Sequence, residues 1–118
     1  MTPNEYQAAA CETAIYPGQG TFWGLQYAAL ELTNEAGEVA GVIKKMQRDS
    51  GYEASDGSHL IEPDDKATLK KELGDAAWGL AMVCSEAGLT LSEVMEANIT
   101  KLSSRKERGV LEGSGDDR

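Results

Sequence analysis

Apolar residues recur at alternating spacings of four and three along two long segments of this chain, which is typical of helices that bury one face. The first segment runs from Phe22 to about Arg48 and the second from about Asp65 to Ala87. The positions that carry the pattern are Leu25, Leu32, Ala36, Val39, Ile43 and Met46 in the first segment, and Leu69, Leu73, Ala76, Leu80, Val83 and Ala87 in the second. The pattern predicts two long amphipathic helices.

Capping signals predict two further helices. Residues 2–5 (TPNE) have the form of a capping box, and the helix that they open should run to about Tyr16, where the run PGQG at 17–20 stops it. Residues 90–93 (TLSE) form a second capping box, which opens a helix that ends near Gly109. No segment shows the period of two that a half-buried strand requires. The chain is therefore expected to be all-α, most simply a four-helix, bundle-like arrangement.

The remaining segments set the domain organisation. A chain of 118 residues fits one domain. We expect residues 1–110 to form a single all-α domain and residues 111–118 to be a flexible polar tail, because this tail is rich in glycine and acidic residues. Residues 49–64 predict a loop that is long for a compact domain, either a functional lid or a mobile insertion.

Charge and composition narrow the classes of function. The net charge of −9 argues against a general affinity for polymeric nucleic acid or for an anionic membrane, although a nucleotide held through a metal ion stays compatible with it. The sequence has neither a signal peptide nor an apolar run approaching the roughly 20 residues of a membrane span. Cys11 and Cys84 lie in helical apolar patterns and are read as two reduced, buried thiols. These features predict a cytoplasmic protein.

Two acidic pairs are the candidate metal ligands. Glu35 and Glu38 lie three residues apart in the first long helix, and Glu72 and Asp75 do so in the second. Residues at this spacing share a helix face. Each of the four directly precedes a position of the apolar stripe, so all four flank the core in the same sense, with Glu31 one turn earlier. A single such pair is common on a solvated face, but two in the same phase predict a divalent cation.

The ligand type indicates which cation. Carboxylate oxygens suit Mg²⁺, Mn²⁺ or Ca²⁺. Di-iron bundles use a Glu-x-x-His motif, which the only histidine, His59, does not complete. Gly37 and Gly74 lie between the acidic residues of each pair, at a cost of about 1 kcal/mol each relative to alanine. Such glycines indicate a close helix approach or space for a ligand.

A polar face near the C-terminus offers candidate phosphate contacts. Asn98, Lys101 and Arg105 have the spacing i, i+3 and i+7, which puts them on one helix face. An amide and two cations fit an anionic oxygen ligand such as a polyphosphate. The alternative is a solvated face that carries salt bridges, and spacing alone does not choose between them.

Taken in this order, the motifs resemble those of the MazG-like nucleotide pyrophosphohydrolases, which belong to the all-α NTP pyrophosphatase superfamily. The resemblance covers roughly residues 22–105, and residues 113–118 (GSGDDR) look like the tail of small single-domain members. It rests on Glu35-x-x-Glu38, Glu72-x-x-Asp75 and Asn98-x-x-Lys101-Leu102-x-x-Arg105.

The resemblance implies hydrolysis of a nucleoside triphosphate to a monophosphate and pyrophosphate. The four acidic residues would ligate Mg²⁺, with Mn²⁺ as a substitute, and Lys101 and Arg105 would contact phosphate. It also implies a homodimer or homotetramer whose sites lie between helices of associated subunits. The physiological role would be house-cleaning of noncanonical or excess nucleotides.

One departure from the family pattern concerns catalysis. Members often carry adjacent glutamates before the first motif, whereas Asn34 precedes Glu35 here. The general base is then expected to be Glu35, or Glu38 in second place, with Glu31 as a further alternative. Trp78 is the candidate for stacking on the nucleobase, with Trp23 and Tyr27 as alternatives and a core position as the competing interpretation.

Two other functions compete with the enzyme. The first is a non-catalytic acidic helical bundle that binds or regulates a partner, and the second is a structural module of a helical oligomer. Carboxylates beside the core and glycines inside the helices favour the enzyme. The identity of the nucleobase is not written in these motifs.

Overall fold

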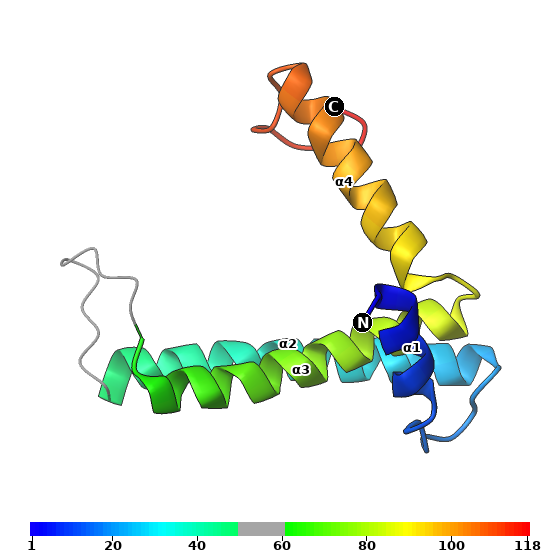
Figure 1. Cartoon of the computed structure of the whole chain (residues 1–118), viewed down its shortest axis with the longest axis vertical. Coiled ribbons are helices and arrows are strands. Elements are labelled where there is room, and N and C mark those ends of the chain that lie inside the picture. Colours follow the sequence, from blue (N-terminus) through cyan, green and yellow to red (C-terminus); the bar gives the residue numbers. More distant parts are fainter. Residues whose placement is uncertain (50–60) are drawn as a thin grey trace.

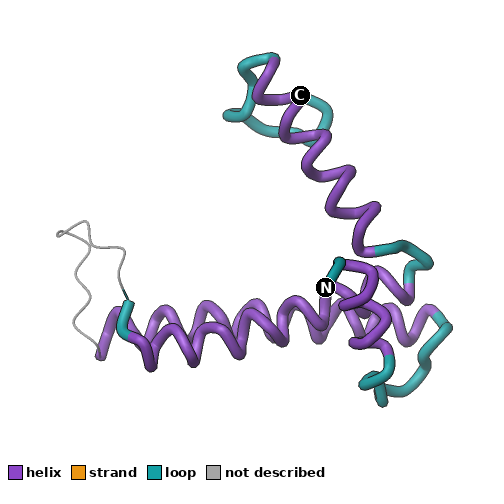
Figure 2. The backbone as a smooth tube through the Cα atoms, viewed as in Figure 1, coloured by secondary structure: helices purple, strands orange, loops and turns teal. Residues whose placement is uncertain are grey.

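The computed structural model describes residues 1–49 and 61–118, and within these ranges every regular element is a helix (Figure 2). In chain order the four helices are α1 (Pro3–Cys11), α2 (Phe22–Asp49), α3 (Pro63–Glu86) and α4 (Leu91–Glu107). The predicted all-α class with four helices is confirmed. The loop predicted over residues 49–64 falls largely outside the described residues.

Local signals fix most helix ends. Thr2 and Thr90 both form the capping boxes that the sequence predicts, each with the glutamate three residues later. Helix α3 ends in a Schellman arrangement, in which the Leu89 amide donates to the Cys84 carbonyl at 2.8 Å and Gly88 has a φ of 71°. The predicted cap Gly88 therefore lies one residue beyond the C-cap, which is Ala87.

Helix α1 is shorter than the capping and stop signals predict, since it ends at Cys11 instead of near Tyr16. The hydroxyl of Thr13 donates to the carbonyl of Ala10 at 2.7 Å, a local bond that competes with continued helix. The chain then turns so that Tyr16 enters the core. Tertiary packing of one aromatic residue overrides the helical preference of this segment.

Helices α2 and α3 run antiparallel, side by side, as a long hairpin (Figure 1). The two helices approach closely at Gly79, where an added Cβ would lie 2.8 Å from the Cα of Leu32. Gly37 and Gly74, in contrast, have open space where a Cβ would be. A close helix approach thus exists, but it uses a different glycine, one turn beyond the acidic pair of α3.

The main buried apolar cluster lies at one end of this hairpin, where α1 packs against α3 and the 12–21 segment reaches α2 through Tyr16 and Tyr27. Tyr16 is central to it: its ring stacks on Tyr27 with centroids 5.0 Å apart and meets the edge of Trp78 at 6.2 Å. Its hydroxyl donates to Glu86 at 2.6 Å, and burial together with this carboxylate raises the pKa of Tyr16. The buried apolar cluster consists of Ala10, Tyr16, Ala28, Ala81, Met82, Cys84 and Leu91.

Helix α4 leaves this core and projects away from the hairpin (Figure 1). Two side chains of α1 cap its first turn: Gln7 accepts from the Leu91 amide at 2.7 Å, and Asn4 accepts from the Ser92 amide at 3.0 Å. Among the described residues α4 contacts α1 and α3 but not α2. The radius of gyration is 17.4 Å, against about 13.5 Å for a compact domain of this length, so the chain is more extended than a compact domain.

Both cysteines carry free thiols. Cys84 is buried, as predicted, but Cys11 is exposed, because α1 ends at this residue and the chain turns away. Over residues 1–49 and 61–118, no helix combines the length and the apolar character that crossing a bilayer requires.

Candidate metal and nucleotide site

Three of the four predicted ligands converge between α2 and α3. Glu35, Glu38 and Glu72 each place a carboxylate oxygen within 4.8 Å of the others. The 35–38 spacing puts two of these carboxylates on one face of α2, and the antiparallel packing brings α3 against that face. Glu35 and Glu72 are half-buried, whereas Glu38 is exposed, which places Glu38 farther from the core than its sequence phase indicates. Three hard oxygen donors at this separation fit Mg²⁺ or Mn²⁺.

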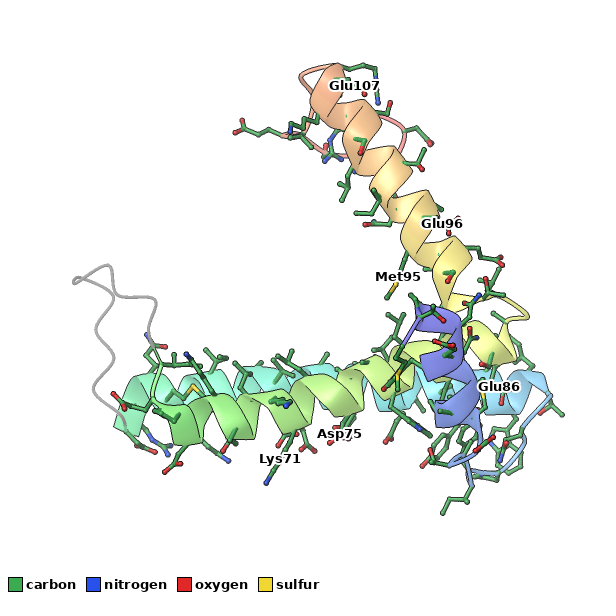
Figure 3. The ribbon with its side chains drawn as sticks, in the orientation of Figure 1. Lys71, Asp75, Glu86, Met95, Glu96 and Glu107 are labelled. Atoms are coloured by element: carbon green, nitrogen blue, oxygen red, sulfur yellow. The ribbon has the colours of Figure 1, made fainter. Side chains whose placement is uncertain are left out.

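Asp75 is exposed and lies beside this group, outside the set that meets within 4.8 Å. It is one of the groups whose negative charge acts on Glu72. Figure 3 shows Asp75 projecting below the hairpin in this view, whereas α4 rises above it. The second residue of the α3 pair is thus at the edge of the cluster.

The carboxylates crowd one another. Burial is the first cause that raises the pKa of Glu72, and the neighbouring charges of Glu38, Asp75 and Glu35 add to it in that order. Like charges at this distance disfavour ionisation unless a cation compensates them. The electrostatics of the cluster are therefore those of a site that a divalent ion would relieve.

An open cleft of about 340 Å³ adjoins the carboxylates. Glu31, Glu35 and Asp75 line its acidic side, and Trp78 and Thr13 line the other. The indole nitrogen of Trp78 donates to the Thr13 hydroxyl at 2.8 Å, which fixes the half-buried ring at the edge of the cleft. The predicted residue Trp78 therefore lies beside the carboxylates. Nothing in the sequence pattern pointed to Thr13, since its contact spans 65 positions of the chain.

The other two aromatic candidates lie elsewhere. Trp23 belongs to an exposed apolar surface of α2, with Tyr27 and Leu30, while the Tyr27 ring stacks on Tyr16. Only Trp78 of the three aromatic residues lines the acidic cleft.

The predicted phosphate-binding face is separate from the carboxylates within one protomer. Asn98, Lys101 and Arg105 all belong to α4, which has no contact with α2 among the described residues. Asn98 and Lys101 are exposed, whereas Arg105 is only 5% exposed. Spacing along one helix predicted that these residues share a helix but held no information on the direction of α4, and their role in phosphate binding stays a prediction.

The C-terminal residues occupy this polar face. Lys101 and Arg105 contact the same carboxylate oxygen of Asp116, at 3.3 and 3.4 Å. Arg105 also donates to the carbonyls of Gly115 and Asp116, while its Nε is buried without a partner among the described atoms. Lys101 first, and then Arg105, lower the pKa of Asp116.

Arg118 closes the tail into a loop. Its guanidinium donates to the carbonyls of Val110, Leu111 and Gly115, and Arg108 donates to the carbonyl of Arg118 at 2.8 Å. Residues 111–118 thus fold back against the end of α4. The flexibility predicted for this tail stays a prediction.

Residues 24–110 match the family model of the MazG nucleotide pyrophosphohydrolase domain. This match covers well over half of the chain, so the protein belongs to that family, as its motifs predict. The chain is also similar to the "Gene 37 protein" of Mycobacterium phage L5, with 44% identity over 116 residues that cover 96% of each protein. No solved structure matches.

Proposed function

We propose that this protein is a Mg²⁺-dependent nucleoside triphosphate pyrophosphohydrolase, which cleaves ribo- or deoxynucleoside triphosphates to the monophosphate and pyrophosphate. The observation that carries the proposal is the meeting of Glu35, Glu38 and Glu72 beside a cleft with an aromatic edge, in a chain of the MazG family. Such an enzyme would remove noncanonical or excess nucleotides in the cytoplasm.

Glu35, Glu38 and Glu72 would hold the cation, and Asp75 would complete the acidic set from the edge of the cluster. A bound Mg²⁺ would neutralise negative charge on the phosphates and lower the pKa of a coordinated water. Mn²⁺ has similar ligand preferences and is the expected substitute.

The carboxylates of the cleft would also take the proton of the attacking water. Glu35 is the first candidate, because it belongs both to the acidic cluster and to the cleft. Glu38 is the second candidate, and Glu31 lines the same cleft without belonging to the cluster. A carboxylate must lie within hydrogen-bond reach of the water to act as its base, which limits the choice to this group. Trp78 would stack on the nucleobase.

The phosphate contacts would come from α4. Lys101 and Arg105, with Asn98, lie too far along an outward-pointing helix to meet the carboxylates of their own protomer. We infer that a partner subunit in a homodimer or homotetramer supplies them. The open shape of the protomer and the exposed apolar residues of α4, Met95, Ile99 and Leu102, support such an assembly.

A panel assay tests the proposal. The protein is incubated with standard and modified NTPs and dNTPs, with and without Mg²⁺, and release of pyrophosphate is measured. We expect pyrophosphate from at least one nucleotide only when Mg²⁺ is present, and loss of activity in Glu38→Gln. Glu96→Gln is the matched control, because Glu96 is an exposed carboxylate of α4 (Figure 3) on the side of the helix opposite Asn98, Lys101 and Arg105.

Absence of pyrophosphate with every nucleotide would overturn the proposal in favour of a binding or structural role. Activity that survives Glu38→Gln would retain the reaction but reject this site.

A further inference from the structure

Asn34 makes two hydrogen bonds inside the candidate metal site. Its side-chain nitrogen Nδ2 donates to Oε1 of Glu35 at 3.1 Å and to Oε1 of Glu38 at 3.3 Å. These two acceptors are the carboxylates that α2 contributes to the cluster. One neutral amide therefore links both acidic residues of the first motif.

We propose that Asn34 is a positioning residue, which holds the Glu35 and Glu38 carboxylates in the orientation that binds a divalent cation. The inference rests on the proposed function for the identity of the site. Asn34 places a neutral amide directly before Glu35, where a carboxylate would increase the negative charge of the cluster.

The geometry explains why a donor is useful here. Three carboxylates whose oxygens lie within 4.8 Å of one another repel each other. The amide of Asn34 is uncharged and donates one hydrogen to each carboxylate of α2, so it offsets part of this repulsion without neutralising either group. Both bonds use Oε1, so the Oε2 of each carboxylate has no bond to Asn34.

Glu38 gains most from this contact. Glu38 is exposed, and an exposed glutamate loses rotamer entropy when it is held in one orientation. Asn34 lies one helical turn before it, which is the spacing at which side chains meet on a helix surface. The bond ties the exposed carboxylate to the half-buried one, Glu35. Outer partners of this kind orient ligands, and their removal typically weakens metal binding by about 10- to 100-fold.

Calorimetric titration of the protein with Mn²⁺ alone tests the role. Asn34→Ala and the similarly shaped Asn34→Leu remove the donor and should raise the Kd for Mn²⁺ about 10-fold or more. Gln47→Ala and Gln47→Leu change an exposed amide of the same helix outside the cluster, and should leave the Kd unchanged. Thermal unfolding in EDTA should show a single cooperative transition above the titration temperature for both Asn34→Ala and Gln47→Ala, so that each Kd is measured on folded protein.

Kinetics provide an independent readout. In Asn34→Ala the Mg²⁺ concentration for half-maximal pyrophosphate release should rise by the same factor as the Kd, while kcat at saturating Mg²⁺ returns towards the wild-type value. A direct catalytic role would lower kcat at every Mg²⁺ concentration and would overturn the assignment of Asn34 as a positioning residue.

The result that rejects the proposal is an Asn34→Ala protein that binds Mn²⁺ as tightly as the wild type, or a wild-type protein that binds no Mn²⁺. The first outcome is separable from failure of the proposed function, whereas the second would also count against the metal site of that function. If the wild type releases no pyrophosphate but loses Mn²⁺ affinity on Asn34→Ala, the reaction is wrong and the positioning role stands.

Discussion

At the scale of single residues, Glu72 shows how the candidate site conflicts with stability. Burial and the charges of three neighbouring carboxylates raise its pKa, which means that the ionised side chain is disfavoured in the folded chain. Hydrogen bonds from Asn34 relieve the repulsion only between the two glutamates of α2. The electrostatics of the cluster thus disfavour the metal-free fold, which agrees with the proposed cation site.

The first prediction concerns the Glu72→Gln variant. In EDTA its Tm should be higher than that of the wild type, because a neutral amide of the same shape removes the disfavoured charge. With saturating Mg²⁺ the order should reverse, since the wild type gains more from binding than a variant with one ligand fewer. Thermal unfolding in both buffers measures this, with Glu96→Gln as the control that should follow the wild type. A lower Tm for Glu72→Gln in EDTA would mean that the carboxylate stabilises the metal-free fold.

At the scale of secondary structure, helix ends were predictable and helix directions were not. Both capping boxes formed where the sequence places them, because a cap depends on residues three positions apart. The direction of α4 depends on Gln7 and Asn4, whose contacts with its first turn span more than 80 positions. The shared face of Lys101 and Arg105 was predictable, but not its occupation by Asp116 of the tail.

The acidic site was predictable for a similar reason. The 35–38 spacing alone puts two carboxylates on one face of α2. Glu72 has the same position relative to the apolar stripe of α3, which predicts that it lies near them, and the three carboxylates do meet. Residues that enter from outside this periodicity, such as Thr13 at the cleft, were not predictable. The glycine that permits close helix packing, Gly79, also went unnoticed, because the sequence shows a glycine but not the neighbour that faces it.

The second prediction follows from that packing. Gly79→Ala should lower the free energy of unfolding by about 1–3 kcal/mol, because its Cβ would meet the backbone of Leu32, which cannot move without separating α2 from α3. Gly41→Ala is the matched control in the other helix of the hairpin. An added Cβ has open space there, so this change should be stabilising by about 0.5–1 kcal/mol. Urea unfolding of both variants measures the difference, and equal effects would contradict the packing described for Gly79.

The third prediction concerns the attachment of the tail to α4. Lys101 and Arg105 hold the pKa of Asp116 below its ordinary value, so the ion pairs are present above the unfolded pKa of about 3.9 and are lost as the pH falls through the lower, folded pKa. Amide NMR shifts of residues 113–117 should therefore change together in that acidic range, while circular dichroism checks that the helices persist.

Variants test the same attachment at neutral pH. Asp116→Asn should already show the released tail shifts at pH 7, whereas Asp117→Asn, the adjacent exposed carboxylate, should keep the bound ones. Identical spectra for the two variants would show that the Asp116 side chain does not hold the tail.

At the scale of the whole molecule, the single chain exposes many large apolar side chains, and α4 contacts only α1 and α3 among the other described helices. Leu73 of α3 is 51% exposed and Ile99 of α4 is 62% exposed. The core lies at one end, and α4 extends from it without contact with α2. In the proposed homo-oligomer, a second copy of the chain would cover these surfaces and bring its α4 to the carboxylates of the first.

The fourth prediction is complementation between two inactive variants. Glu38→Gln removes a carboxylate of the cluster and Lys101→Ala removes a phosphate contact, so each homo-oligomer should be inactive or strongly impaired. If each site combines the carboxylates of one subunit with α4 of another, subunit exchange creates some sites with both residues intact. For a symmetric dimer, random mixing in equal amounts should restore about a quarter of the wild-type activity.

Pyrophosphate release after co-refolding measures this recovery, and Glu38→Gln mixed with Glu72→Gln is the control. That control should stay inactive, because both changes affect the same half of the site. No recovery in the test mixture would place Lys101 and the carboxylates in one subunit or remove Lys101 from the site. Recovery in the control would mean that Glu38 and Glu72 of one site come from different subunits, which would contradict the cluster within one chain.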